Sequence, residues 1–269
     1  MVQAESPLLL TYKRRLLFRI AVFIVCAILY FASETLDADL LEFGPKNLNF
    51  LHVIWVIFAL DMIVIFSRRS KVSMGSIKQF KRNYIEPKVQ VAKETIKKAR
   101  RKMNIQAAKV LLVWILLNGI VAALYYTKLI RARDLFLISA FYYVSDLICI
   151  IYFCPFQKWI MRNRCCTTCR IFNWDELMIV TPLLLFPSIY SWTLGGIALI
   201  ALIVWEFNFY RHTERFLEET NDHLKCVNCT DKLCFHRPPI WPKVIQKVQV
   251  KVKETIEDVQ TKIKKRKEK

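Results

Sequence analysis

Residues that break helices or build flexible loops are scarce in this chain. Five glycines and nine prolines make up 14 of its 269 residues, and there are only four histidines. So little glycine and proline excludes a collagen-like or low-complexity protein, and a hydrophobic content of 55% excludes an intrinsically disordered one. Polar stretches outside a few strongly basic segments are missing too, which argues against an ordinary soluble enzyme.

Motifs that mark common enzyme sites are also absent. The chain has no phosphate-binding G-x-x-x-x-G-K-[ST], no dinucleotide-binding G-x-G-x-x-G, no zinc-protease H-E-x-x-H and no hydrolase G-x-S-x-G. No set of serine, histidine and aspartate suggests a catalytic triad. We therefore favour a function other than catalysis.

What the chain does contain is six long apolar runs. A membrane-spanning helix needs about 20 mostly apolar residues. The first run is longer than the core of a signal peptide and lacks a clean cleavage motif, so we expect it to be retained. We predict an all-α integral membrane protein with a six-helix transmembrane bundle, whose spans are 16–33, 50–66, 107–130, 135–156, 177–190 and 192–210.

Lysine and arginine predict which ends of these runs face the cytoplasm. Cytoplasmic loops collect the two residues and translocated loops do not. Six crossings place residues 1–15, 67–106, 157–176 and 211–269 on one side, with 3, 13, 4 and 15 of the 41 lysines and arginines. The opposite loops hold three. We expect a multi-pass plasma-membrane protein with both termini in the cytoplasm.

Two cytoplasmic segments, residues 79–103 and 240–268, have the composition of basic amphipathic helices. In the second segment, apolar residues recur every three or four positions with lysines between them. Such helices suit the anionic lipids of the inner leaflet, or they pair with each other, with a protein partner or across a homo-oligomer. A solvated basic tail is the third interpretation. Neither segment has the aromatic or glycine-rich pattern of a nucleic-acid site, so we expect no nucleic-acid partner.

Six of the nine cysteines form two clusters, and each cluster contains one C-x-x-C. The first pair is Cys166 and Cys169, and the second is Cys226 and Cys229. If the fifth and sixth runs form a membrane hairpin, both pairs lie on the cytoplasmic side, where thiols stay reduced. Four thiolates suit a tetrahedral metal site, so we predict a structural zinc knot, with Cys165, Cys234, His223 and His236 as reserve ligands.

Other interpretations of the cysteines remain open. The same thiolates could hold an iron–sulfur cluster or a single iron ion, could form a dithiol redox pair, or could bind no metal. At the end of the first cluster, Asn173 is expected to cap the fifth helix with Glu176 as its reciprocal partner. Alternatively, Asp175 and Glu176 line a site beside the metal.

Two aspartates lie within the apolar runs, Asp61 in the second and Asp146 in the fourth. A charge at the bilayer centre costs at least about 2.5–3.5 kcal/mol, and neither lysine nor histidine in the runs offers a partner. Arg19 is expected to extend towards the membrane surface. The aspartates therefore line a proton or cation path, or are protonated and hydrogen-bonded to polar neighbours such as Asn118, Tyr142 or Tyr143.

The sequence favours a membrane scaffold or interaction protein, in which zinc joins the loop between helices four and five to the C-terminal tail. One alternative is a redox or electron-transfer component, and another is a small ion or solute transporter that uses the two aspartates. The expected sections are a first hairpin (1–67), a basic segment (68–106), a second hairpin (107–156), a Cys-rich loop (157–176), a third hairpin (177–210) and a tail (211–269).

Overall fold

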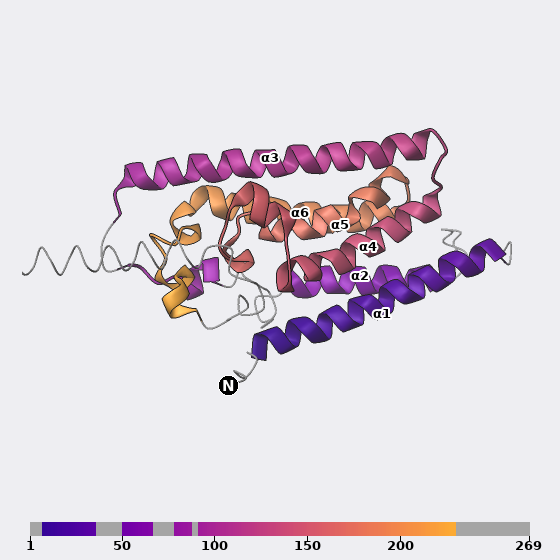
Figure 1. Cartoon of the computed structure of the whole chain (residues 1–269), viewed down its shortest axis with the longest axis horizontal. Helices are drawn as coiled ribbons and strands as arrows, with labels where there is room; N and C mark the ends of the chain where they lie inside the picture. The colour runs from indigo at the N-terminus through magenta and orange to yellow at the C-terminus, as the bar shows by residue number, and fades with distance from the viewer. Residues whose placement is uncertain (1–6, 36–49, 67–77, 88–90, 230–269) are drawn as a thin grey trace, which may run out of the picture. The chain divides into compact units, whose positions relative to one another are not determined.

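The computed structural model describes residues 7–35, 50–66, 78–87 and 91–229, all of which belong to one compact unit (Figure 1). Within these ranges the chain forms helices and no strand, which confirms the predicted all-helical class. The α-helices are α1 (Pro7–Thr35), α2 (Phe50–Phe66), α3 (Lys93–Tyr126), α4 (Ala132–Ile151), α5 (Asp175–Val180) and α6 (Ile189–Arg211).

Four of these helices, α1, α3, α4 and α6, are long and apolar enough to cross a membrane. Helix α2 is shorter, with an apolar stretch over His52–Val64, and its bounds match the predicted run 50–66. The fifth run does not form one α-helix. A six-residue α5 continues as the 3-10 helix Thr181–Leu185, and Ser188 then caps the start of α6.

The basic segment before α3 also differs from its prediction as a helix over residues 79–103. A short 3-10 turn covers Lys81–Asn83, and the backbone is not helical from 84 to 87 or at 91 and 92. From Lys93 onwards the basic residues belong to α3 itself, because its 34 residues run without interruption into the apolar part. The second basic segment, 240–268, lies outside the described residues.

Contacts between helix ends show how the helices are oriented: α1 is antiparallel to α4, α2 is parallel to α6, and α3 is antiparallel to α6. Tyr30, near the end of α1, donates a hydrogen bond to Asp134 at the start of α4. The indole of Trp55 in α2 donates to Thr193 near the start of α6, 3.1 Å away. At the opposite end of the unit, the guanidinium of Arg100 near the start of α3 stacks 3.9 Å over the ring of Tyr210.

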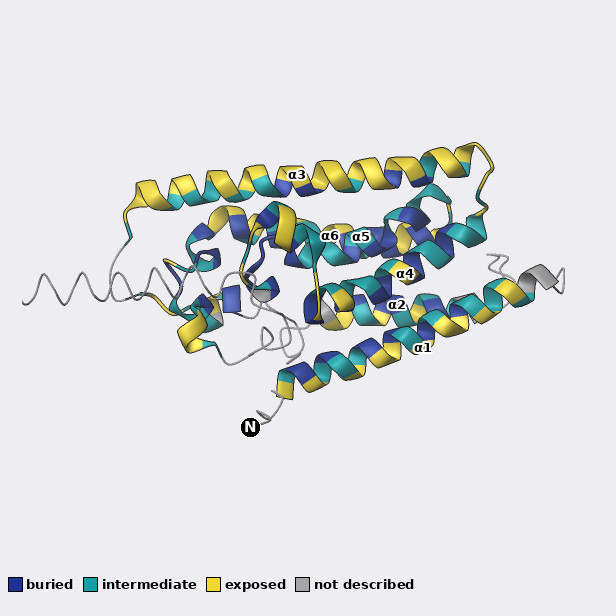
Figure 2. Ribbon diagram, in the orientation of Figure 1, coloured by how far each residue is buried: buried dark blue, intermediate teal, exposed yellow. Residues whose placement is uncertain are grey.

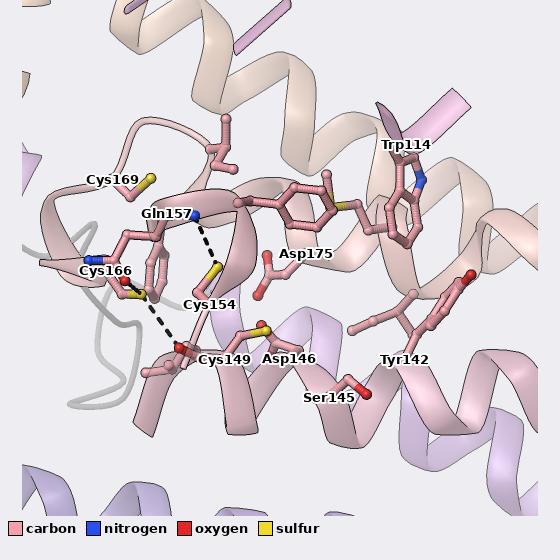
Figure 3. A pocket seen from close by; sticks show the side chains of 16 residues that line it. Trp114, Tyr142, Ser145, Asp146, Cys149, Cys154, Gln157, Cys166, Cys169 and Asp175 are labelled. Carbon is pink, nitrogen blue, oxygen red and sulfur yellow. Dashed lines mark hydrogen bonds between the residues drawn. The ribbon is translucent and has the colours of Figure 1, made fainter. Parts of the chain in front are cut away.

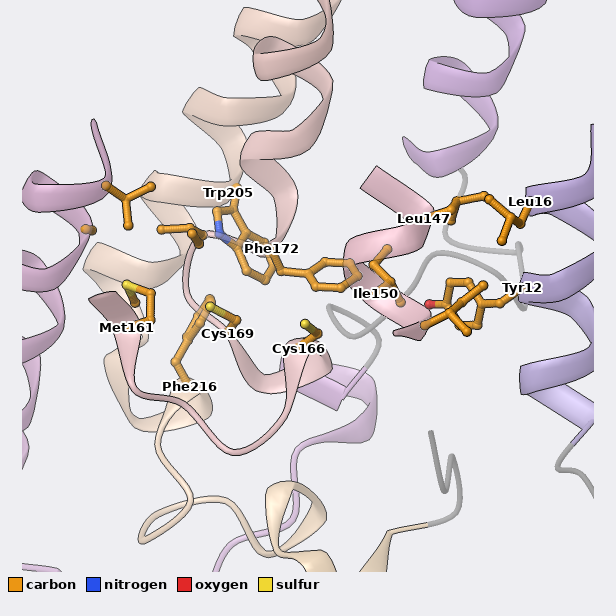
Figure 4. Close-up of a cluster of buried hydrophobic side chains, with 14 of the residues drawn as sticks. Tyr12, Leu16, Leu147, Ile150, Met161, Cys166, Cys169, Phe172, Trp205 and Phe216 are labelled. Atoms are coloured by element: carbon orange, nitrogen blue, oxygen red, sulfur yellow. The ribbon is translucent and has the colours of Figure 1, made fainter. Parts of the chain in front are cut away.

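The buried side chains form two clusters along the bundle. The first cluster joins α1, α4 and α6 to the loop that carries Cys166 and Cys169, with Trp205 and Phe216 among its members (Figure 4). The second packs α2 against α4 and α6 through residues such as Phe58. Helix α3 is different, because most of its apolar side chains face outwards (Figure 2).

Candidate functional site

The main polar feature of the described residues is a network of acids and arginines inside the bundle. It begins with Arg19, whose side chain is only 1% exposed. Arg19 lies on the buried stripe of α1, between Leu16 and Val22 in the spacing of one helical face. The expectation that Arg19 extends to the membrane surface is therefore wrong: the side chain points into the bundle.

Arg19 joins three helices through ionic and hydrogen bonds. Its Nη1 donates to Asp146 Oδ2 at 2.7 Å and to the Tyr143 carbonyl oxygen at 2.8 Å, both in α4. Its Nη2 donates to Asp61 Oδ2 in α2 at 3.0 Å. The guanidinium also lies 4.0 Å from the centre of the Tyr143 ring. Arg19 is thus the cationic partner that the sequence analysis did not find for either aspartate.

Asp61 has two further partners. Arg15, one helical turn before Arg19, donates to Asp61 Oδ1 at 2.9 Å. The Tyr143 hydroxyl donates to Asp61 Oδ2 at 3.0 Å. The predicted hydrogen bond between an intramembrane aspartate and Tyr143 is therefore present. Asp61 and Asp146 are both shielded from solvent, with side chains 18% and 12% exposed.

Two more carboxylates lie beside this network at the start of α5. Glu176 is 4% exposed, and it interacts electrostatically with Arg19, Asp61 and Asp146. Among the described residues, Glu176 Oε1 and Asp175 Oδ2 are buried without a hydrogen-bond partner. Unmatched buried oxygens of this kind are costly, and each calls for an explanation such as protonation, local strain or a functional role.

The segment that leads into α5 is held against α6 by side-chain contacts. Asn173 lies inside a 3-10 turn, and Trp174 occupies the position before α5 without a side-chain cap, so the predicted Asn173 cap is wrong. The Trp174 indole instead donates to Glu206 of α6 at 2.8 Å, and Glu206 also pairs with Arg170. These contacts hold the segment before α5 so that the first turn of α5 faces the bundle.

A charge count over the network gives an imbalance. Within the described ranges, four carboxylates (Asp61, Asp146, Asp175 and Glu176) face two guanidinium groups, those of Arg15 and Arg19. An apolar interior does not hold two uncompensated negative charges. Two of these carboxylates therefore need a further positive charge, and protonation alone would supply it.

A cavity of about 130 Å³ adjoins the network (Figure 3). Asp146 and Asp175 face it, and Trp114 of α3 closes it on one side. Four cysteines also line it, namely Cys149, Cys154, Cys166 and Cys169. Most of the wall is apolar, and the carboxylates are its charged groups.

Asn118, the third predicted polar residue of the membrane region, does not join the network. It is buried in α3, and its side-chain amide donates to the Trp114 carbonyl oxygen at 3.0 Å. Among the described residues its Oδ1 atom has no hydrogen-bond partner. Asn118 thus lies one turn along the helix from the aromatic side chain that borders the cavity.

The first C-x-x-C packs into the hydrophobic core. Cys166 and Cys169 are both buried, and the Cys166 thiol donates to Gln157 Oε1 at 2.9 Å. The backbone turns between them, since the Cys169 N–H donates to the Cys166 carbonyl oxygen at 2.9 Å. Burial raises the pKa of the Cys169 thiol to about 12. This thiol is therefore protonated at neutral pH.

The second C-x-x-C adopts the same turn but packs against the segment before α3. Cys229 Sγ lies 3.6 Å from Lys78 Nζ, and Cys226 is exposed. Asn221, fully buried, hydrogen-bonds to backbone atoms of Lys78 and Ile85, and the His223 ring bonds to the Asn83 carbonyl oxygen at 2.9 Å.

These contacts bear on the predicted metal ligands. In the ranges that the structure describes, no group of three or more His, Cys, Asp and Glu side chains is placed to hold a metal ion. The first C-x-x-C faces the core and the second lies against residues 78–85, so the structure does not gather the four predicted sulfurs. Of the reserve ligands, Cys165 is half-buried, His223 is hydrogen-bonded to Asn83, and Cys234 and His236 lie outside the described residues.

Comparisons with known proteins give no relative for this chain: no family model, no curated protein and no solved structure matches it.

Proposed function

We propose that this protein is an integral membrane protein that moves protons across the bilayer, using the acid–arginine network as its proton-binding site. The observation that carries the proposal is Arg19, fully buried between Asp61 and Asp146 and adjoined by the carboxylates of Asp175 and Glu176. Ionisable groups inside apolar helices are expensive and usually serve ion or proton movement.

Membrane insertion is supported by the surface of the helices. Large apolar side chains are exposed along the outer faces of α3 and α6, including Leu112 at 59%, Ile120 at 61% and Ile203 at 57% exposure. Water-soluble monomers rarely expose so much contiguous apolar surface, whereas lipid tails cover it without cost. The charge distribution of the loops supports cytoplasmic termini and a plasma-membrane location.

Six crossings follow if the fifth run is counted as a broken helix. The 3-10 helix Thr181–Leu185 leads to the turn before Ser188, and Tyr190 after that turn contacts His52 at the start of α2. The fifth run thus reaches the end of the bundle where α2 begins. Broken helices near buried charges are a recurrent feature of membrane transporters.

Helix α3 places part of the basic charge away from the bilayer. Its 34 residues span about 50 Å, while the hydrocarbon core is about 30 Å thick. Because the helix is continuous, its basic part, 93–106, cannot lie flat on a membrane that its apolar part crosses. We propose that this part projects into the cytoplasm, with only its membrane-proximal lysines and arginines reaching anionic lipids.

The network offers a simple mechanism for proton movement. Arg19 holds Asp61 and Asp146 while both are ionised. When a proton passes from Glu176 to one of the two aspartates, the attraction of that aspartate for the guanidinium falls and the attraction of Glu176 rises. Arg19 would then alternate between two sets of carboxylates, which is the two-state element that a transport cycle requires.

The zinc-tied scaffold and the redox component remain alternatives. Their zinc, iron and iron–sulfur forms need the two cysteine pairs to act together, and the placement of the second pair against residues 78–85 gives these forms less support than the network gives to transport. A dithiol redox centre needs only one of the two pairs. Metal analysis of the purified protein would decide the zinc, iron and iron–sulfur alternatives independently of any transport measurement.

The proposal is tested by reconstituting the protein in liposomes that contain a pH-sensitive dye. A potassium diffusion potential drives protons inwards, and acidification is compared between the wild type, Asp61→Asn and Asp146→Asn. We expect both variants to lose at least about tenfold in rate. Glu94→Gln is the matched control, because Glu94 is an exposed acid outside the network. Liposomes in which the wild type acidifies no faster than protein-free vesicles would refute the proposal.

A further inference from the structure

The cavity next to the network has the walls of an aromatic cage. The Trp114 ring lies 5.0 Å from the Tyr142 ring and 6.2 Å from the Phe156 ring, measured between centroids. All three line the same space, together with Phe172 from the cysteine loop. The Trp114 indole N–H is held by Thr181 Oγ1 at 3.3 Å, which fixes the tryptophan on the broken fifth segment.

The carboxylates give this cage its charge preference. Asp146 and Asp175 both face the cavity (Figure 3). Of these two, Asp146 is hydrogen-bonded to Arg19. The buried Oδ2 of Asp175 lacks a hydrogen-bond partner within the described part of the chain. A negative charge among aromatic faces attracts a cation, and the ring faces add a favourable cation–π contribution.

The size and chemistry of the cavity select the kind of cation. A hard metal ion such as Mg²⁺ or Ca²⁺ needs six or more oxygen ligands, part of them water, and a mostly apolar wall with two carboxylates suits so hydrated an ion poorly. At about 130 Å³ the space is close to the cavity of about 150 Å³ that accepts benzene in an apolar protein core. A small organic cation, with methyl groups against the rings and its charge near Asp175, fits both features.

We propose that the cavity binds a small quaternary ammonium compound. The binding site stands on the cavity alone, whereas exchange of this cation for protons rests on the proposed transport function. Because Asp146 belongs to both the cavity and the Arg19 network, an entering cation competes with Arg19 for that carboxylate and favours release of its guanidinium. The shared aspartate thus provides the coupling between cation and proton.

Binding is tested on the full chain in detergent, with choline as the probe and 3,3-dimethylbutanol as its uncharged isostere. The readout is the rate at which N-ethylmaleimide labels Cys149, which lines the cavity, followed by peptide mass spectrometry. We expect saturating choline to slow the labelling at least fivefold and the isostere to have little effect. Asp175→Asn and Trp114→Leu should each weaken choline binding by about tenfold.

The control variant is Asp222→Asn, which removes an acid outside the cavity that pairs with Lys225. Its choline affinity should equal that of the wild type. Equal protection by choline and its isostere, or no protection by choline in correctly folded protein, would overturn the proposal. Choline binding without proton flux would preserve the binding site and refute transport, whereas proton flux without choline binding would do the reverse.

Discussion

Replacing Arg19 with methionine should strongly destabilise the folded protein. The change keeps a long side chain on the buried stripe of α1 but removes bonds to Asp146 at 2.7 Å, to the Tyr143 carbonyl oxygen at 2.8 Å and to Asp61 at 3.0 Å. Removing one member of a buried ionic network leaves the others uncompensated, which typically costs about 3–5 kcal/mol. That is a large share of the stability of most proteins, about 5–15 kcal/mol.

The assay is equilibrium unfolding in detergent, followed by tryptophan fluorescence. Arg14→Met is the matched control, because Arg14 lies on α1 but is exposed, and its loss should change the free energy of unfolding by less than about 0.5 kcal/mol. In the double variant Arg19→Met/Asp146→Asn a charge of each sign is removed, and at least about 2 kcal/mol should be recovered. An Arg19→Met protein as stable as the Arg14→Met control would refute the assigned role of the network.

Three further predictions concern other parts of the fold. A Cβ at Gly195 would lie 2.6 Å from a leucine side chain of the preceding 3-10 helix, whereas nothing lies within 4 Å of a Cβ at Gly196. Gly195→Val should therefore lower the free energy of unfolding by about 1–3 kcal/mol more than Gly196→Val in the same assay. Equal losses of stability would contradict this packing. Asn221→Ala removes hydrogen bonds to three backbone segments. Amide hydrogen exchange should therefore accelerate in residues 78–85 but not in the helices. Unchanged exchange in residues 78–85 would show that Asn221 does not hold them in place. Burial raises the pKa of the Cys169 thiol to about 12. The rate at which maleimide labels Cys169 should therefore rise about tenfold per pH unit from about pH 8 to 10, and it should stay below the rate for exposed Cys226. Labelling of both thiols at one rate would contradict the burial of Cys169.

The helical class and the long helices could be predicted from the sequence because hydrophobicity and length determine them directly. Pro182 and Pro187 in the fifth apolar run indicate an interrupted helix, because proline prevents a regular one. The start of α3 was placed too early, because lysine-rich composition alone does not show where tertiary contacts allow a helix to begin.

The central contact of the site was missed for a different reason. Arg19 was assigned by its distance from the end of the apolar run, which suggested that it reaches the membrane surface. The spacing from Leu9 and Tyr12 through Leu16 places Arg19 on the same face of α1. That spacing was the available signal, but only the packing of α1 on α2 and α4 reveals that both aspartates meet this face. A site role for Asp175 and Glu176, beside a metal, was only the alternative to helix capping, and the structure places the two acids beside Arg19.

The most direct test of the account is proton uptake by liposomes containing Arg19→Met/Asp146→Asn. This pair removes one positive and one negative charge, so the fold should be retained while the alternating carboxylate partners of the guanidinium are lost. The account predicts a stable, correctly folded protein whose liposomes acidify no faster than protein-free vesicles. Uptake at the wild-type rate would contradict it, and would show that the buried charges only hold the helices together.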